Sequence, residues 1–195
     1  MKIIVFGATG LIGKEIVKQA LYNGNTVKAF GRNIFTAALP EDDKLELLQG
    51  VLFDEGEVRN AITECDAVLS AIGGTYDGAD KTRSLGIKNI VKQMEKVGVK
   101  RIVALGGMGV LDGENGKMVM EQEDFPAEYF AVTQEHKKAY EFLKASNLDW
   151  TFVCPAMIEE AAPTGVFVTA ANQLQEPNHF KISSGDLALF MLKEM

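Results

Sequence analysis

Hydrophobic and polar residues follow one another in blocks that predict alternating strands and helices. Short runs dominated by apolar residues are typical of strands buried on both faces of a parallel sheet. Such runs occur at residues 2–6, 26–30, 45–49, 67–70, 101–105 and 150–154, and a further short strand is predicted near 180–182.

Between these runs, apolar residues recur at helical spacing, which predicts helices at 11–22, 55–63, 82–97, 128–145 and 185–194. Asn23-Gly24 and Gly98 tolerate left-handed backbone and end two of these helices. The alternation predicts an α/β fold, a single Rossmann-type doubly wound parallel sheet with helices on both faces. Right-handed crossovers order the strands 3-2-1-4-5-6, plus the short late strand, and place a ligand at the carboxyl ends of strands one and four.

Composition limits the classes of partner. The chain has 195 residues, 47% of them hydrophobic, so we expect one domain over 1–195. A net charge of −7 argues against nucleic acid and anionic membranes, because those surfaces require clustered Lys and Arg. With no membrane-spanning run and no room for a signal peptide before the first strand, the cytoplasm is the expected location. Cys65 and Cys154 lack CxxC partners, so we predict neither a metal site nor a disulfide.

The first strand leads directly into Gly7-Ala8-Thr9-Gly10-Leu11-Ile12-Gly13. A glycine turn between a strand and a helix lets backbone N–H groups and the positive end of the helix dipole meet a pyrophosphate. A plain turn without a ligand is the alternative, but the apolar helical face that follows favours the first interpretation. We therefore predict a dinucleotide held by Gly7, Thr9, Gly10, Leu11, Ile12 and Gly13.

The end of the second strand indicates which dinucleotide binds. Proteins specific for NAD usually carry Asp or Glu there, and a carboxylate would repel a 2′-phosphate. This chain instead has Gly31-Arg32-Asn33, in which Arg32 offers a planar cation suited to phosphate. We predict a preference for NADP(H) over NAD(H), the alternative being that Arg32 is a solvated loop residue.

The GxxGxxG spacing resembles the short-chain dehydrogenase/reductase superfamily. Phrases at 86–91, 97–103, 142–151 and 182–188 resemble its atypical branch, which includes biliverdin reductase B, also called flavin reductase, and the NmrA-like proteins. The resemblance covers nearly the whole chain and implies one NAD(P)-binding domain with a minimal C-terminal substrate region.

The resemblance also implies later cofactor contacts. Relatives commonly hold the adenine amine with an Asp one residue after the glycine that follows strand three, but here Val51 takes that place. We transfer no adenine role to Asp54, which is suited to capping the next helix. The remaining predicted cofactor residues are Leu52, Ala71, Ile72, Gly73, Gly106, Lys137, Pro155, Ala156 and Met157.

The catalytic pattern of the superfamily is incomplete. Most members carry Ser or Thr after strand five, where this chain has Gly107, and a Tyr-xxx-Lys on the next helix. Tyr140 and Lys144 match that spacing, but Tyr140 lies roughly 18 Å along its helix, at about 1.5 Å per residue, so we do not assign it to the site. Aligning the helix on its exit into strand six places Thr133 at the tyrosine position and Lys137 at the lysine position.

Three residues of this helix are therefore the catalytic candidates: Lys137, Thr133 and His136. The resemblance implies that Lys137 bonds the nicotinamide ribose and that His136 contacts substrate, while a solvated lysine and an exposed helical histidine are the alternatives. The predicted substrate contacts are Gly107, Met108, Gly109 and Tyr76. Residues 111–125 form either a lid or a surface loop.

These features favour an NAD(P)H-dependent oxidoreductase that reduces a planar conjugated acceptor, such as a flavin, a quinone or a tetrapyrrole, by direct hydride transfer. Such a reaction needs a stacked acceptor more than a side-chain acid, since water can supply the proton. The missing hydroxyl groups also suit a non-catalytic NADP(H)-binding redox sensor of the NmrA-like type. A sugar-nucleotide epimerase or dehydratase fits the glycine spacing alone. No feature of the sequence predicts an oligomeric state.

Overall fold

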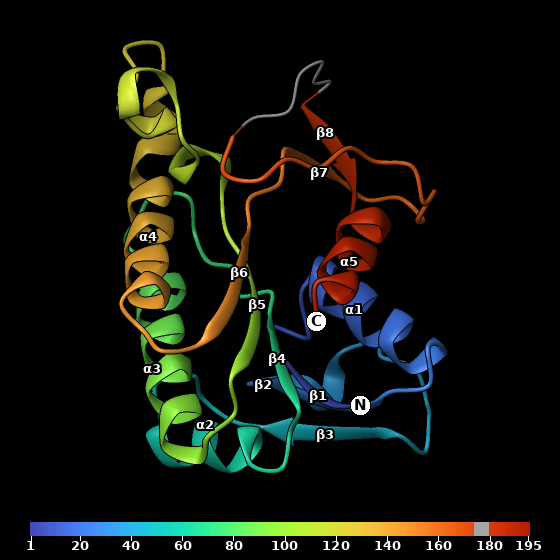
Figure 1. Cartoon of the computed structure of the whole chain (residues 1–195). Coiled ribbons are helices and arrows are strands. Elements are labelled where there is room, and N and C mark those ends of the chain that lie inside the picture. The colour runs from blue at the N-terminus through green and yellow to red at the C-terminus, as the bar shows by residue number, and fades with distance from the viewer. Residues whose placement is uncertain (174–179) are drawn as a thin grey trace.

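The computed structural model describes residues 1–173 and 180–195 and contains a six-stranded parallel sheet (Figure 1). Its strands are β1 (Lys2–Phe6), β2 (Thr26–Gly31), β3 (Leu45–Gln49), β4 (Ala67–Ser70), β5 (Arg101–Leu105) and β6 (Asp149–Val153). They lie in the order β3-β2-β1-β4-β5-β6, and each neighbouring pair is parallel. The predicted fold class and strand order are confirmed.

Helices cover both faces of the sheet (Figure 1). On one side lie α1 (Leu11–Tyr22) and α5 (Ser184–Lys193), and on the other lie α2 (Glu55–Ile62), α3 (Thr82–Val97) and α4 (Ala127–Lys144). In β1, Ile3 and Val5 pack with the first pair, whereas Ile4 and Phe6 pack with the other three. The strand is apolar from Ile3 to Phe6 because successive side chains enter two different cores.

Local signals end and begin the helices as predicted. Gly24 follows α1 with φ of +82°, and Gly98 ends α3 with φ of +83°, in the left-handed region that glycine adopts at little cost. Asp54 is the N-cap of α2, since its carboxylate accepts a 2.8 Å hydrogen bond from the backbone N–H of Glu57.

A second, two-stranded sheet lies beyond β6. It pairs β7 (Met157–Glu159) in parallel with β8 (Lys181–Ser183), the strand predicted near 180–182. The hydrophobic pattern did not predict β7, because it has three residues and two of them, Met157 and Glu159, are exposed. The late strand therefore does not extend the main sheet.

Residues 108–125 form three short 3₁₀ helices: η2 (Met108–Val110), η3 (Glu114–Gly116) and η4 (Val119–Glu121). The backbone N–H of Asp112 donates to the carbonyl of Asn172 at 2.7 Å, and that of Val119 donates to Leu111 at 2.9 Å. Met120 is buried. The predicted lid or loop is therefore folded down against the rest of the protein.

No helix among the described residues is long and apolar enough to cross a bilayer. No group of three or more His, Cys, Asp and Glu side chains in residues 1–173 and 180–195 could hold a metal ion. Cys65 and Cys154 are free thiols.

Candidate active site

The glycine turn after β1 packs against α1 and against the first residues that follow β4. Gly7 has φ of +80°, and a Cβ added to it would lie 2.4 Å from the carbonyl oxygen of Ala71. A Cβ on Gly13 would lie 2.1 Å from the carbonyl oxygen of Gly7. Both distances are too short for any side chain, so this turn and the first turn of α1 require glycine at these two positions.

The N-terminus of α1 is open. Gly10 is its N-cap and has no side chain to bond the first N–H groups, and the first turn carries no acidic residue. Thr9, Gly10 and Leu11 are exposed. Unpaired N–H groups and the positive end of the helix dipole therefore face the carboxyl edge of the sheet, and this geometry fits a pyrophosphate.

Arg32 lies beside this turn. It follows β2, and a Cβ on the preceding Gly31 would lie 3.1 Å from the methyl group of Thr9. The backbone carbonyl of Arg32 accepts a 2.9 Å hydrogen bond from the side chain of Gln49, which fixes the loop. The guanidinium is exposed and forms no ion pair with any described residue, so its charge is available to an anion.

The segment after β4 is held in place by a side chain of α3, the helix that follows it. Ala71 and Ile72 are buried and Gly73 is exposed at the edge. Arg83 of α3 is itself buried and donates to the carbonyl oxygens of Gly74, at 2.9 Å, and Thr75, at 2.8 Å. The sequence analysis missed Arg83, although an arginine one residue into the helix after a Gly-Gly loop is a signal that could have identified it.

Leu52 and Tyr76 were predicted to contact cofactor and substrate. Leu52 is half-buried, and its carbonyl oxygen accepts a 2.8 Å hydrogen bond from Asn89 of α3. Tyr76 lies on the loop after β4 and is 69% exposed. Leu52 is therefore held against α3, whereas the side chain of Tyr76 is free to reach a ligand.

Helix α4 brings two of the catalytic candidates against the end of β5. The His136 ring lies 2.9 Å from the position that a Cβ on Gly107 would occupy, and the Thr133 methyl lies 2.4 Å from that of Gly109. Thr133 is buried, with 5% of its surface exposed. Thr133 and His136 therefore lie against the end of β5, and Thr133 has little surface open to solvent.

Lys137 is paired with the 3₁₀ segment. Its ammonium lies 3.0 Å from the Glu121 carboxylate, and the lysine side chain is 28% exposed. The backbone N–H of Met118 and the Lys137 ammonium hold the pKa of Glu121 below its ordinary value. Lys137 is therefore neither buried nor fully solvated, and Glu121 keeps its charge at the rim of the site.

His136 is held in its neutral form. Burial, assisted by the positive charge of Arg83, lowers its pKa from 6.5 to about 4, and its Nδ1 is buried without a hydrogen-bond partner among the described residues. The other ring nitrogen, Nε2, lies 3.3 Å from the position that a Cβ on Gly107 would occupy, and a neutral imidazole can donate or accept one hydrogen bond at this atom.

This neutral state predicts a pH dependence of stability. The folded-state pKa lies below the unfolded one, so the stabilisation is complete above about pH 6.5 and is lost as the pH falls toward about 4. Between about pH 7.5 and about pH 5.5 the free energy of unfolding should fall by about 1 kcal/mol more in the wild type than in His136→Gln. Urea unfolding at both pH values checks this, and identical losses in the two proteins would contradict it.

Tyr140 lies on α4 one helical turn beyond His136 and packs against β6. Its ring packs against Trp150 at 5.8 Å and Phe152 at 6.0 Å between centroids, and the Lys144 ammonium lies over it at 5.7 Å. Tyr140 and Lys144 therefore take part in the packing between α4 and β6.

The segment after β6 closes the other side of the site. Gly106 is buried, and its N–H donates to the carbonyl of Val153 at 2.7 Å. Pro155 and Ala156 are half-buried, and Met157 is 62% exposed at the start of β7. Burial raises the pKa of the neighbouring Cys154 to about 12, so this thiol is not a nucleophile at neutral pH.

Three proteins illustrate what the chain is similar to. A structure described as a "putative exported protein" from Burkholderia pseudomallei is 34% identical, with a TM-score of 0.85 over 100% of this chain and 92% of that chain. SP1627 from Streptococcus pneumoniae TIGR4, described as a "putative NADH-flavin reductase", is 26% identical, with the same TM-score and coverage. The uncharacterised YwnB of Bacillus subtilis (strain 168) is 25% identical over 100% of this chain and 92% of its own length.

The sequence model of a protein family described as NAD(P)H-binding matches residues 7–195. The match begins at the first glycine of the turn, the same part of the chain in which the open helix N-terminus fits a pyrophosphate. The resemblance identified in the sequence is thereby confirmed. The chain belongs to the NAD(P)H-binding family.

Proposed function

We propose that this protein is an NADPH-dependent reductase of a planar conjugated acceptor. The observation that carries the proposal is the pairing of an uncapped α1 N-terminus with an unpaired Arg32 beside it, on an edge where Gly107 and Thr133 provide no exposed hydroxyl acid. When bound, NADPH supplies the hydride, and the protein supplies orientation and a water-poor surface. SP1627, described as a "putative NADH-flavin reductase", supports the reductase class.

The cofactor would extend along the carboxyl edge of the sheet. The α1 N-terminus would bond the pyrophosphate and Arg32 the 2′-phosphate, which would give a preference for NADPH over NADH. Ala71 to Gly73 would lie against the riboses. Lys137 would bond the nicotinamide ribose, and Pro155 to Met157 would meet the carboxamide.

The acceptor would lie over the segment Gly107 to Gly109. Met108, Met157 and Tyr76 would provide apolar contacts, since Met157 and Tyr76 are largely exposed. His136 would bond a polar edge of the acceptor through Nε2, the ring nitrogen nearer to Gly107. The proton that accompanies the hydride would come from water, so no side-chain acid is required.

The experiment that tests this function measures binding and turnover together. NADPH and NADH are titrated by fluorescence, and FMN, a quinone and a linear tetrapyrrole are then added to the same samples. We expect tighter binding of NADPH and its oxidation by at least one acceptor. Binding without oxidation by any acceptor would contradict a reductase.

A redox sensor is the second candidate, and the buried Thr133 favours it, because the site lacks the acid used by most superfamily members. A sensor binds NADPH and NADP⁺ tightly without turnover, and its partner distinguishes the two states. Equal affinity of such a partner for the NADPH-bound and NADP⁺-bound protein would exclude the sensor.

The proposed setting follows from the proposed reaction. One dinucleotide-binding domain would carry the whole function, with a small-molecule acceptor and without nucleic acid or a membrane. We propose the cytoplasm as its compartment, where a pool of NADPH and reduced thiols such as Cys65 and Cys154 are both maintained.

A further inference from the structure

The adenine end of the proposed site lacks the carboxylate expected after β3, because Val51 stands at that position. A carboxylate from another element contacts the backbone at this position. Glu57, in the first turn of α2, accepts a 2.7 Å hydrogen bond from the backbone N–H of Val51 through its Oε2 atom. Its Oε1 atom accepts no hydrogen bond from any described residue, so it remains available to a donor.

The position of Glu57 is fixed by its helix. Its backbone N–H donates to the N-cap carboxylate of Asp54 at 2.8 Å, so that Asp54 is already occupied by capping. A Cβ on Gly50 would lie 3.0 Å from Oε2 of Glu57 and 2.5 Å from the ring of Phe30. The carboxylate therefore stands directly over the turn that leaves β3, beside an aromatic ring.

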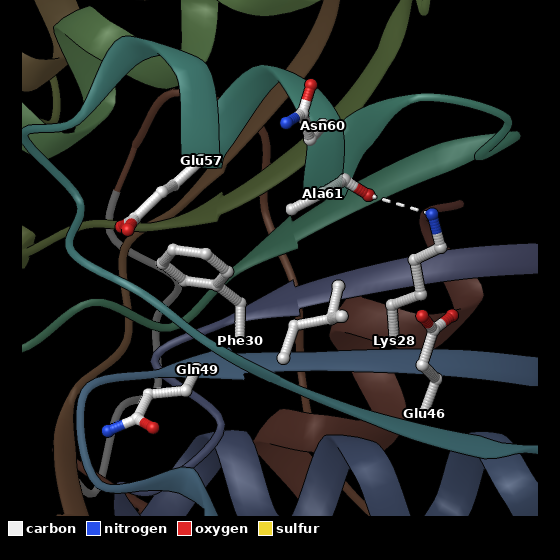
Figure 2. A pocket seen from close by; sticks show the side chains of 8 residues that line it. Lys28, Phe30, Glu46, Gln49, Glu57, Asn60 and Ala61 are labelled. Carbon is white, nitrogen blue, oxygen red and sulfur yellow. Dashed lines mark hydrogen bonds between the residues drawn. The ribbon is translucent and has the colours of Figure 1, made fainter.

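A shallow hollow of about 240 Å³ opens at this point. Figure 2 shows Glu57, Phe30 and Gln49 at one end of it and Lys28 and Glu46 at the other. Lys28 is turned toward α2, where its ammonium donates to the carbonyl of Ala61 at 3.2 Å. Phe30 is 2% exposed, so its ring forms the floor of the first end. The exposed carboxylate of Glu57 supplies a free acceptor there, which suits the amino edge of a purine base.

The hollow adjoins the loop proposed to hold the 2′-phosphate. Gly31 is paired with Gln49 across the two strands, and the N–H of Gly50 donates to the carbonyl of Gly31 at 3.3 Å. The side chain of Gln49 bonds the carbonyl of Arg32 at 2.9 Å. A base joined through its ribose to a phosphate at Arg32 therefore lies within reach of Glu57.

Resting on the function proposed above, we infer that Glu57 recognises the adenine of the cofactor by accepting a hydrogen bond from its exocyclic amine through Oε1. Glu57 then determines base specificity, in addition to supporting the turn through Val51. A carboxylate accepts from an amine and repels a carbonyl oxygen, so it selects adenine over hypoxanthine.

The test compares the affinities of NADPH and its hypoxanthine analogue, in which a carbonyl replaces the amine. The wild type should bind NADPH about tenfold more tightly, as one charge-assisted hydrogen bond allows. In Glu57→Gln the amide oxygen still serves Val51, but its NH₂ group donates where a second acceptor stood. The tenfold ratio should fall to about one or invert.

Glu46→Gln is the matched control, because it neutralises a carboxylate at the other end of the same hollow and should leave the ratio unchanged. If Glu57 only supported the turn, Glu57→Gln would weaken both nucleotides equally and the ratio would persist, which would overturn the inference. Equal binding of both nucleotides by the wild type would also overturn it, while leaving dinucleotide binding intact. Binding of neither would instead refute the proposed function, and the role of Glu57 with it.

Discussion

Gly13→Ala is expected to destabilise the protein and to abolish tight dinucleotide binding. Alanine normally favours a helix over glycine by about 1 kcal/mol, but here the added Cβ would lie 2.1 Å from the carbonyl oxygen of Gly7. The glycine turn and α1 must move apart, at an expected cost of about 3 kcal/mol in the free energy of unfolding. For a chain of this size, that corresponds to a fall in melting temperature of roughly 6–12 °C.

Gly10→Ala is the matched variant for this effect. Its Cβ would meet one atom within contact range, the carbonyl oxygen of Gly7 at 3.4 Å, and its φ of −82° is accessible to alanine. We expect a change in stability of about 0.5 kcal/mol or less. Its methyl group would nevertheless occupy the open space in front of α1, so NADPH should bind more weakly while the fold is retained.

Calorimetry and fluorescence titration of both variants separate the role of these glycines in stability from their role in dinucleotide binding. A large loss of stability in Gly13→Ala, a small change in Gly10→Ala, and weaker binding in both variants are predicted. If Gly13→Ala had the same melting temperature as the wild type, this result would contradict the close contact between Gly13 and Gly7. Unchanged NADPH affinity in Gly10→Ala would contradict the position assigned to the pyrophosphate.

Arg32→Gln is expected to weaken NADPH binding by about 10- to 100-fold, because a charge-assisted hydrogen bond to phosphate contributes about 1.5–3 kcal/mol. NADH lacks the 2′-phosphate, so its affinity should change little. The preference of the wild type should also decline as salt is raised, since Arg32 is exposed.

Arg59→Gln is the control, because Arg59 is another exposed arginine, on α2, and lies outside the proposed site. It should alter neither affinity. If Arg32→Gln weakened NADPH and NADH equally, the residue would support the loop rather than read the phosphate. Tighter binding of NADH than NADPH by the wild type would remove the proposed preference altogether.

Regular structure was predictable because it depends on short-range patterns. The central strand β1 is an apolar run from Ile3 to Phe6 that packs on both faces, as Ile3 and Ile4 show by entering opposite cores. Gly24 and Gly98 mark helix ends through their own backbone preference. By contrast, β7 has three residues, two of them exposed, and therefore leaves no hydrophobic signal.

The glycine turn was predictable for the same reason, but contacts between distant residues were not. The sequence places Glu121 in a loop and Lys137 on a helix, and nothing in either segment indicates that they pair. The approach of Glu57 to Val51 depends on how α2 folds back over the end of β3. Arg83 is buried because its guanidinium meets two loop carbonyls, whereas an isolated arginine is expected to be exposed.

Direct hydride transfer from a cofactor held in one orientation is the central claim, and isotopic labelling tests it most directly. NADPH carrying deuterium at either of its two C4 positions is oxidised in a single turnover with the best acceptor, and the NADP⁺ formed is analysed by mass spectrometry. Because α1, Arg32 and α4 would fix which face of the nicotinamide meets the acceptor over Gly107, deuterium should be lost from one labelled form and retained in the other. Loss of label from both forms, or no oxidation of bound NADPH, would contradict the account.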